Sequence, residues 1–536
     1  MKRSLFLILI IPFFAFAQQN PMRDLSNMTK GTIYTKKDPP KTPELKKLLL
    51  RDTVTQYGIT WKFDKKVPIG QFINGDYYVV GAVTVVSITP NPMIGKDIPK
   101  EELDVNEAKK VNDVMIRNGS MLNPPAKQEM AYDSGIRNWY KLDMITNVPY
   151  ELKPTDCLVS SISLKKGENI NRIYNGEAGS PIFRAHEDDS PVKTMAVLTC
   201  VAEPLPPDAF RPSYCDRAGK IYYARDLKRE LLPNLERVIS APGSLELFIR
   251  LFQRPWVDTG FFGFGQPLEN MPLYGREVGR VVGWGALMLM QKYPPQDKER
   301  LLINYVQVGI DYWGVVKSGH PGWAAYGGHG SGRKINMVIA GILLGDEQMA
   351  SPTKSFPEVR FQEDMHTIYD NSWTGAFVVY SGHLGSEDGK RRAGLKQLDW
   401  NSYEHLYPQQ WDGKTGENYR RCCTSVAWVG QALAMRLLHA EQNWNHDAFF
   451  DYMDRWMYED DSAAVEELKK LGMDYSATWA RQGQAWGSTS APVVASINTS
   501  GSTAKVTVPD KMVEDMWAKY RKTLEAPIDG WKTQKK

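Results

Sequence analysis

The residues best suited to chemistry in this chain are its histidines, and seven of the eight lie between His320 and His446. Imidazole has an unperturbed pKa close to neutrality, so histidine is the usual side chain for accepting and donating protons. The same stretch is rich in Trp, Tyr, Arg and Gly, which suit the binding of polar rings and anions. The sequence therefore predicts that a catalytic centre draws on this stretch.

The first candidate constellation is GHPGWAAYGGHGSGRKIN, residues 319–336, which directly precedes an apolar, helix-like run. Glycines let the backbone approach a ligand closely, and a helix N-terminus favours an anion. The spacing does not match the phosphate-binding pattern G-x-x-x-x-G-K-[ST], and a turn that only reverses the chain is the competing interpretation. The candidate side chains here are His320, Trp323, Tyr326, His329 and Arg333.

Two further constellations follow at 363–389 and 401–423. The former either converges on a site or forms a loop held by local turns of Asp and Asn. The latter ends in paired arginines, which suit bidentate recognition of a carboxylate or sulfate or are simply solvated. The side chains of interest are His366, Asp370, Asn371, Trp373, Tyr380 and His383 in the former, and Tyr403, His405, Tyr407, Tyr419, Arg420 and Arg421 in the latter.

The chemistry that needs these residue types together is β-elimination on a uronic acid. The C5 proton becomes acidic only when the neighbouring carboxylate is neutralised; a base then removes it, and an acid protonates the oxygen that leaves C4. The candidates are His329 as base, Tyr326 or Tyr419 as acid, Arg333, Arg420 or Asn371 for neutralisation, His383 and His405 as second choices, and Trp323, Trp373 and Arg421 for substrate binding.

Other functions use different residues. Glycoside hydrolysis requires two carboxylates that face the bond, and the available ones are Asp364, Asp370, Glu404, Asp412 and Glu417. There is no H-E-x-x-H or similar ligand spacing and no G-x-S-x-G motif, so we expect neither a metal or other cofactor nor a serine nucleophile. A non-catalytic glycan-binding protein would use the 16 Trp and 25 Tyr but would leave the histidine cluster without a role.

The elements that would position these residues indicate a multidomain α+β chain. Residues 18–235 contain alternating runs and an Asn74-Gly75 hairpin signal, which predict a β-rich, sandwich-like domain. Residues 236–490 predict a domain of helical pairs that resembles an α/α toroid, and 491–536 a hairpin at 492–508 and a short helix. The expected helices are 276–293, 298–313, 333–345, 425–441, 446–459, 463–472 and about 510–525.

The chain opens with MKRSLFLILIIPFFAFAQQ, which has the features of a signal peptide over residues 1–17. Its apolar run is too short to span a bilayer, so we expect a secreted or periplasmic protein without a membrane anchor. The net charge of +4 comes without a long basic run, which argues against nucleic acid as a partner. Of five cysteines, Cys200 and Cys215 are placed to close a small loop as a disulfide.

Several segments resemble a group of secreted proteins encoded in polysaccharide-utilisation loci of marine bacteria. They are WKFDKKVPIGQFINGDYYVVGAVTVVSITP, NGSMLNP, KPTDCLVSSIS, RPSYCDR and GGHGSGRKIN. The group includes ulvan-active carbon–oxygen lyases, namely an ulvan lyase and a dehydratase of ulvan oligosaccharides. The resemblance implies an acidic polysaccharide or oligosaccharide substrate and an elimination at C4, with a sugar or water as leaving group. It assigns no catalytic residue.

Overall fold

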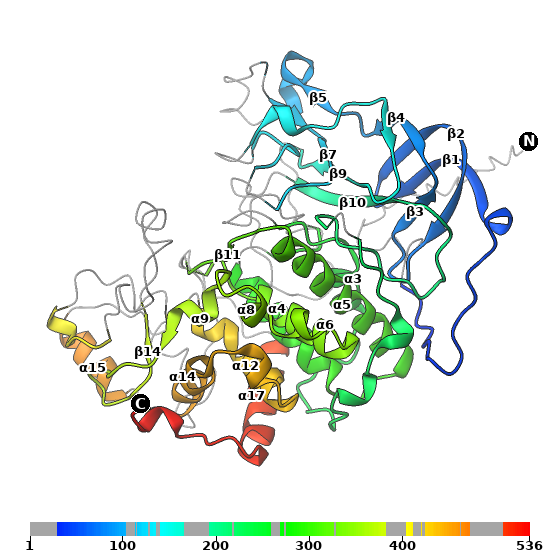
Figure 1. The fold of residues 1–536 in the computed structure, drawn as a ribbon. Helices are drawn as coiled ribbons and strands as arrows, with labels where there is room; N and C mark the ends of the chain where they lie inside the picture. Colours follow the sequence, from blue (N-terminus) through cyan, green and yellow to red (C-terminus); the bar gives the residue numbers. More distant parts are fainter. Residues whose placement is uncertain are drawn as a thin grey trace, which may run out of the picture.

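The chain combines a β-rich N-terminal half with a helical C-terminal half (Figure 1). The computed structural model describes residues 29–102, 113, 115–126, 129–135, 140–165, 192–216, 219–258, 269–272, 275–325, 328–381, 404–410, 420, 424–460, 462–471 and 508–535. The expected mixed α+β class is therefore confirmed. The expected signal peptide and the hairpin at 492–508 lie outside the described residues.

The β-rich half is built on a single curled sheet of eight strands. Their order is β7 (Ser120–Leu122), β9 (Cys157–Ser163), β10 (Val192–Val201), β3 (Tyr77–Val80), β2 (Ile59–Gln71), β4 (Val83–Thr89) and β8 (Tyr150–Leu152), with β1 (Leu49–Gln56) also paired to β2. Only β10 and β3 run parallel. Trp61, Phe63 and Leu198 belong to the core of this sheet. Among the described residues one curled sheet thus replaces the two facing sheets that a sandwich would require.

The hairpin signal at Asn74-Gly75 is confirmed. Strands β2 and β3 are antiparallel around it, with Gln71 opposite Tyr77. Gly75 has φ +91°, which glycine adopts without the steric penalty of a side chain. The Asn74 side chain is buried and donates from Nδ2 to Asp76 Oδ2 at 2.8 Å. The hydrogen bond fixes Asp76 in the hairpin turn, on the side of the sheet that faces the helical half.

The helical half contains each helix that the sequence predicts. The helices are α3 (Glu246–Gln253), α4 (Gly275–Leu289), α5 (Pro295–Lys317), α6 (Arg333–Leu344), α7 (Glu347–Ala350), α8 (Pro352–Ser355), α9 (Gln362–His366), α12 (Ser425–Leu437), α13 (Glu441–Trp444), α14 (Asp447–Tyr458), α15 (Ser462–Lys470) and α17 (Val508–Tyr520). Pro295 opens α5 at its first position, where its missing N–H costs nothing, rather than only terminating α4. Short two-stranded pairs join β5 (Met93–Ile94) to β6 (Ile116–Arg117), β11 (Gly322–Trp323) to β12 (Arg360–Phe361), and β13 (Thr367–Ile368) to β14 (Val379–Tyr380).

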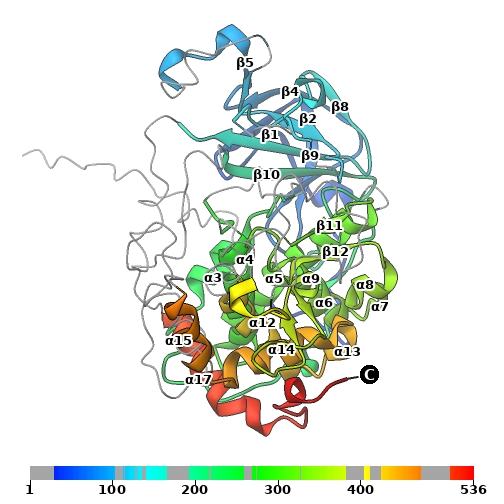
Figure 2. The ribbon, with the colours of Figure 1, turned by 90° about the vertical axis from the view of Figure 1, so that its left-hand side faces the viewer.

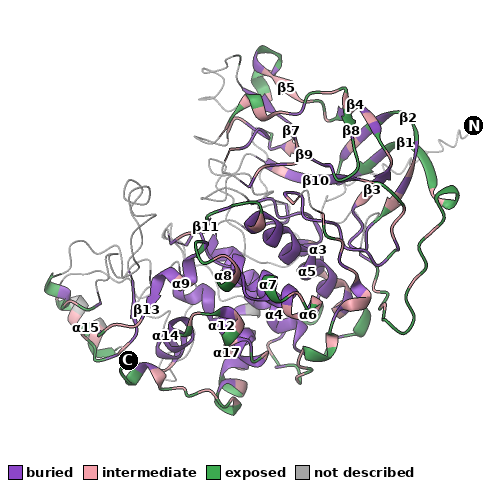
Figure 3. Cartoon of the chain, viewed as in Figure 1, coloured by how far each residue is buried: buried purple, intermediate pink, exposed green. Residues whose placement is uncertain are grey.

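The central helices pack side by side as the pairs α4 with α12 and α5 with α6 (Figure 2). Every residue of α4 and α12 is buried, as Figure 3 shows for the middle of the helical half. A helix that is buried all round belongs to the centre of a large core. The pair α5 and α6 approaches closely at Gly309, where a Cβ would lie 2.3 Å from the Asn336 carbonyl oxygen.

One buried arginine joins the two halves. Arg211 donates from Nε to Asp76 Oδ2 at 2.6 Å, and from Nη1 and Nη2 to the two oxygens of Asp311 at 3.0 and 2.6 Å. Asp76 belongs to the hairpin turn of the sheet and Asp311 to α5, and all three side chains are fully buried. The curled sheet and the helical core therefore share one ion-pair network.

Helix α17 closes the helical core from a segment far along the chain. It packs against α4 and α12, and Asp510 in its first turn accepts hydrogen bonds from Arg280 of α4. Met512, Met516 and Trp517 of the same helix are buried in the main core. No helix among the described residues is long and apolar enough to cross a membrane.

Cys200 and Cys215, the candidate pair for a disulfide, are not bonded to each other. Both are free and buried, as is Cys157. Burial raises the pKa of the Cys200 thiol to about 12, and that of the Cys157 thiol to about 11. These cysteines therefore behave as small core side chains. Cys422 and Cys423 lie outside the described residues.

Candidate active site

The described parts of the first two constellations meet at Trp428, a fully buried residue on the first turn of α12. Its indole Nε1 donates to Ser331 Oγ at 3.0 Å, in the first constellation. Its ring lies 5.9 Å from that of His366 and 6.4 Å from that of Tyr380, both in the second. Thr424, which directly precedes α12 and follows the third, donates to the Tyr380 hydroxyl at 3.2 Å. We call Ser331, His366, Tyr380, Thr424 and Trp428 the Trp428 cluster.

Glycines allow the helix ends around this cluster to approach. A Cβ on Gly275, the first residue of α4, would lie 2.0 Å from the His329 carbonyl oxygen. Gly332 caps α6 with φ +89°, and a Cβ there would lie 2.7 Å from the backbone of Gly279 in α4. Gly332 of the glycine-rich stretch is thus required by the close backbone packing between the starts of α4 and α6.

Within the Trp428 cluster, His366 and Tyr380 are the pair best arranged to accept and donate a proton. Their rings stack at 4.6 Å with an interplanar angle of 12°. His366 Nδ1 lies 2.8 Å from the carbonyl oxygen of Ser381, which can only accept, so Nδ1 carries the proton. The neutral ring then presents Nε2 as an acceptor, 3.5 Å from the Tyr380 hydroxyl. An acceptor nitrogen and a phenol proton are therefore held side by side.

Two short elements fix this pair. His366 ends α9 and Tyr380 ends β14, and β13, which directly follows α9, pairs with β14 so that Thr367 lies opposite Tyr380. The Ser381 N–H donates to the His366 carbonyl at 2.7 Å, which complements the bond from the imidazole to the Ser381 carbonyl. Both side chains of the pair are buried. Residues 382–403 and 411–419, which follow Tyr380 and precede Arg420, lie outside the described part of the chain.

A buried ion-pair network lies beside Tyr380. Glu404 accepts two hydrogen bonds from Arg455 of α14, at 2.9 and 3.0 Å, and one from the Tyr380 backbone N–H. Arg420 Nη1 lies 3.5 Å from Glu404 Oε1, and Arg420 Nε donates to the Tyr452 hydroxyl at 3.0 Å. Arg420 is thus a predicted arginine that lies next to the Trp428 cluster, where its carbonyl also accepts a hydrogen bond from Thr424 Oγ1 at 3.3 Å.

Glu363 is a buried carboxyl that sequence reasoning missed. It accepts a hydrogen bond from the Gly332 N–H at 2.6 Å, at the start of α6. Burial raises the pKa of Glu363 to about 7, and the Gly332 N–H opposes that rise. Glu363 and His366 are spaced by three residues on α9, and this Glu-x-x-His spacing on a short helix is the signal that could have found it.

Two predicted site residues serve the core instead. The Arg333 guanidinium is fully buried; it donates from Nε to Asp258 Oδ2 at 2.8 Å and from Nη1 to the carbonyls of His329 and Ser331. It is therefore committed to the protein rather than available to a substrate carboxylate. Trp323 is fully buried, and its ring packs against those of Tyr312 and Phe361.

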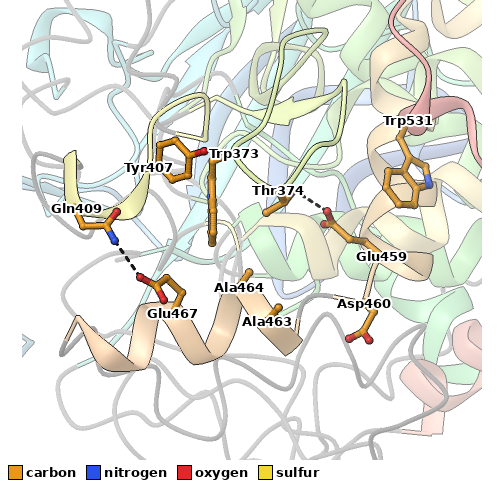
Figure 4. A pocket seen from close by; sticks show the side chains of 10 residues that line it. All are labelled: Trp373, Thr374, Tyr407, Gln409, Glu459, Asp460, Ala463, Ala464, Glu467 and Trp531. Atoms are coloured by element: carbon orange, nitrogen blue, oxygen red, sulfur yellow. Dashed lines mark hydrogen bonds between the residues drawn. The ribbon is translucent and has the colours of Figure 1, made fainter.

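The other predicted residues are dispersed. His329 is half-buried at the start of α6, and Asn371 and His405 are exposed. Trp373 lines a pocket with Tyr407 and Trp531 (Figure 4). Tyr326, His383, Tyr419 and Arg421 lie outside the described residues.

The carboxylates considered for hydrolysis are mostly engaged. Asp364 pairs with Lys334 Nζ at 2.5 Å and accepts from Trp444 Nε1 at 2.9 Å. Asp370 caps the backbone N–H of Asn371 at 2.7 Å, and Glu404 is held by Arg455. Asp412 and Glu417 lie outside the described residues. Within the described ranges, no three His, Cys, Asp or Glu side chains are grouped to hold a metal ion.

No protein-family model matches this chain, and no curated protein or solved structure is significantly similar to it.

Proposed function

We propose that this protein is a secreted carbon–oxygen lyase that cleaves a uronate-containing, sulfated polysaccharide of the ulvan type by β-elimination. The observation that carries the proposal is the His366–Tyr380 pair. The C5 proton and the C4 oxygen of a uronate are on adjacent carbons, so a base and an acid that serve both must lie a few ångströms apart. The 3.5 Å between His366 Nε2 and the Tyr380 hydroxyl meets this requirement.

In this proposal His366 takes one proton from the substrate and Tyr380 gives one proton to it. Neutral His366 accepts the C5 proton at Nε2, the C4–C5 double bond forms, and the C4–O bond breaks. Tyr380 donates its phenolic proton to the departing oxygen. The imidazolium then returns a proton to the Tyr380 oxygen across the short gap between them, which restores both groups.

Arg420 is the residue that we propose to neutralise the substrate carboxylate. It is a predicted arginine and adjoins Tyr380 through Glu404 and Tyr452. Neutralisation matters because the charge that develops during C5 deprotonation is delocalised onto the carboxylate. We further propose that the helical half is an α/α toroid, supported by the paired central helices, and that residues 1–17 direct export.

The first experiment incubates the purified protein with ulvan and with ulvan oligosaccharides and follows both ultraviolet absorbance of the unsaturated uronate and product masses. Rising absorbance with shorter chains supports the lyase. Rising absorbance with loss of one water and no shortening assigns the alternative, a dehydratase that uses the same elimination. Cleavage with gain of water and no absorbance would identify a hydrolase, and no change on any uronate substrate would favour a binding protein.

Variants then locate the acid and the base. We expect Tyr380→Phe and His366→Asn each to lower turnover by about 10²–10⁴-fold, the usual contribution of one positioned acid or base. His329→Ala tests the earlier assignment of the base, because His329 is half-buried at the start of α6 and is not part of the pair. If His329→Ala were inactive while Tyr380→Phe and His366→Asn remained active, the assignment of base and acid to His366 and Tyr380 would be wrong.

A further inference from the structure

A pocket of about 640 Å³ lies between α15, the turn at 372–376 and residues 404–410 (Figure 4). Its volume is in the range of small-molecule sites. Trp373 and Tyr407 stand next to each other on one side, with ring centroids 6.5 Å apart and planes inclined by 51°. Trp531 faces the pocket from the opposite side (Figure 4). The pocket is therefore flanked by aromatic rings.

The aromatic rings of this pocket suit a sugar. Tyr407 is 63% exposed. An aromatic ring in water lacks the favourable free energy that burial of its apolar surface would provide, for example against a ligand. The Trp531 indole N–H donates to the Ile528 carbonyl at 3.2 Å, so this donor does not require a hydrogen-bond partner on a ligand. Flat apolar faces with a polar tip at Tyr407 match the C–H face and hydroxyl rim of a pyranose.

Carboxylates set the charge of the pocket. Glu459 is compensated, because Arg455 Nε donates to it at 2.9 Å. Asp460 is exposed and accepts local hydrogen bonds from Ser462, one of them from its backbone N–H at 3.1 Å. Glu467 accepts from Gln409 Nε2 at 3.0 Å and has a loose, exposed contact with Lys470 at 3.6 Å, which offsets little charge. Asp460 and Glu467 therefore leave the pocket negative.

We propose that this pocket binds an uncharged sugar ring and disfavours a uronate. Sugar hydroxyls can donate hydrogen bonds to Asp460 and Glu467, whereas a ligand carboxylate would be repelled by both. The pocket adjoins the candidate active site, because the Trp373 backbone N–H donates to the Glu404 carbonyl at 2.8 Å. It contains none of the residues assigned to the elimination, so binding here and catalysis can fail independently.

The test compares three ligands that share one ring. Glucose, glucuronate and glucosamine are added in turn to the Tyr380→Phe protein, in which turnover is suppressed, and ring contact is measured by saturation-transfer difference NMR. We expect glucose to give a signal at least about fivefold above glucuronate. Tyr407→Ala should abolish the glucose signal, while the matched control Tyr407→Phe, which keeps the ring, should retain most of it.

Charge removal is the second arm. Asp460→Asn combined with Glu467→Gln should bring the glucuronate signal up to that of glucose, because the repulsion is gone while hydrogen-bonding atoms remain. A glucose signal that survives Tyr407→Ala would overturn the assignment of the pocket. So would a stronger signal for glucuronate than for glucose, or a weaker signal for glucosamine than for glucuronate, in the Tyr380→Phe protein, because the two carboxylates repel an anion and attract an ammonium group.

Discussion

His366 is held in one tautomer by a single backbone carbonyl, and that contact determines what the residue can do. With Nδ1 protonated on the Ser381 carbonyl, only Nε2 can accept a proton, and it faces Tyr380. The same side chain without this contact would divide between two tautomers, and one of them would present a donor to the phenol. The orientation of one peptide unit thus decides which nitrogen can act as base.

Glu363 gives a prediction about pH and stability. The folded carboxyl has a pKa of about 7, raised from 4.5, so between these values the folded state holds a proton that the unfolded chain has lost. The protonated carboxyl therefore contributes its full amount to the free energy of unfolding below pH 4.5, and this contribution is lost as the pH rises to 7. Glu363→Gln should remove this dependence and raise the free energy of unfolding at pH 8 by up to about 3 kcal/mol relative to the unsubstituted protein.

The measurement for Glu363 is urea unfolding from pH 5 to 8. The exposed Glu358→Gln serves as control and should leave the pH profile unchanged. If Glu363→Gln followed the same pH profile as the unsubstituted protein, the carboxyl would not be the group that titrates near neutrality.

The sequence indicated residue types but not which side chains come together. His366 and Tyr380 were named only as members of a constellation, without a role, because their types are visible in the sequence and their contact is not. Nor does the sequence show that Arg333 pairs with Asp258, or that Trp323 packs against Tyr312 and Phe361. Glu363 was missed because burial, which raises its pKa, depends on contacts with residues distant in sequence.

At the scale of elements, the helices were the most predictable part of the chain. Apolar periodicity located the longer ones, since a helix that packs on a core must repeat its apolar face every turn, but it did not locate α3 or the short helices α7, α8, α9 and α13. Their ends were less predictable. The helix expected at 298–313 runs from Pro295 to Lys317, and the helix expected at 425–441 ends at Leu437.

The contact between α5 and α6 provides a prediction at this scale. Gly309→Ala places a methyl group 2.3 Å from the Asn336 carbonyl oxygen, so one helix must shift. We expect a net loss of about 2 kcal/mol in the free energy of unfolding, after the better helix propensity of alanine is included. Gly243→Ala is the matched control, because a Cβ there meets no atom within 4 Å. Chemical denaturation that found the two variants equally stable would contradict the close approach.

For the whole molecule, the sheet was the part that sequence reasoning described least accurately. Alternation and turn signals identified strands, but they do not specify which strands pair. The parallel contact between β10 and β3 joins segments more than a hundred residues apart, and it merges what would have been two sheets into one. Long-range pairing of this kind depends on the fold as a whole.

Arg211 gives the prediction for the whole molecule. Arg211→Ala would leave Asp76 and Asp311 buried without their cation, which typically costs about 3–5 kcal/mol. The surface pair of Lys292 with Glu236 is largely exposed, so Lys292→Ala should change stability by about 0–1 kcal/mol. Thermal unfolding of both variants tests this, and similar melting temperatures would mean that Arg211 does not hold the sheet to the helices.

The contact of Arg280 with Asp510 has a consequence for the order of events during synthesis. Arg280 is buried in α4 and pairs with Glu277 of the same helix, but its second carboxylate, Asp510, is made some 230 residues later. The helix that carries Asp510 also places Met512, Met516 and Trp517 in the main core. Until α17 has been synthesised, the apolar side chains that it covers stay in contact with water, which leaves part of the favourable burial unrealised. The helical core of a nascent chain is therefore completed only near the end of translation.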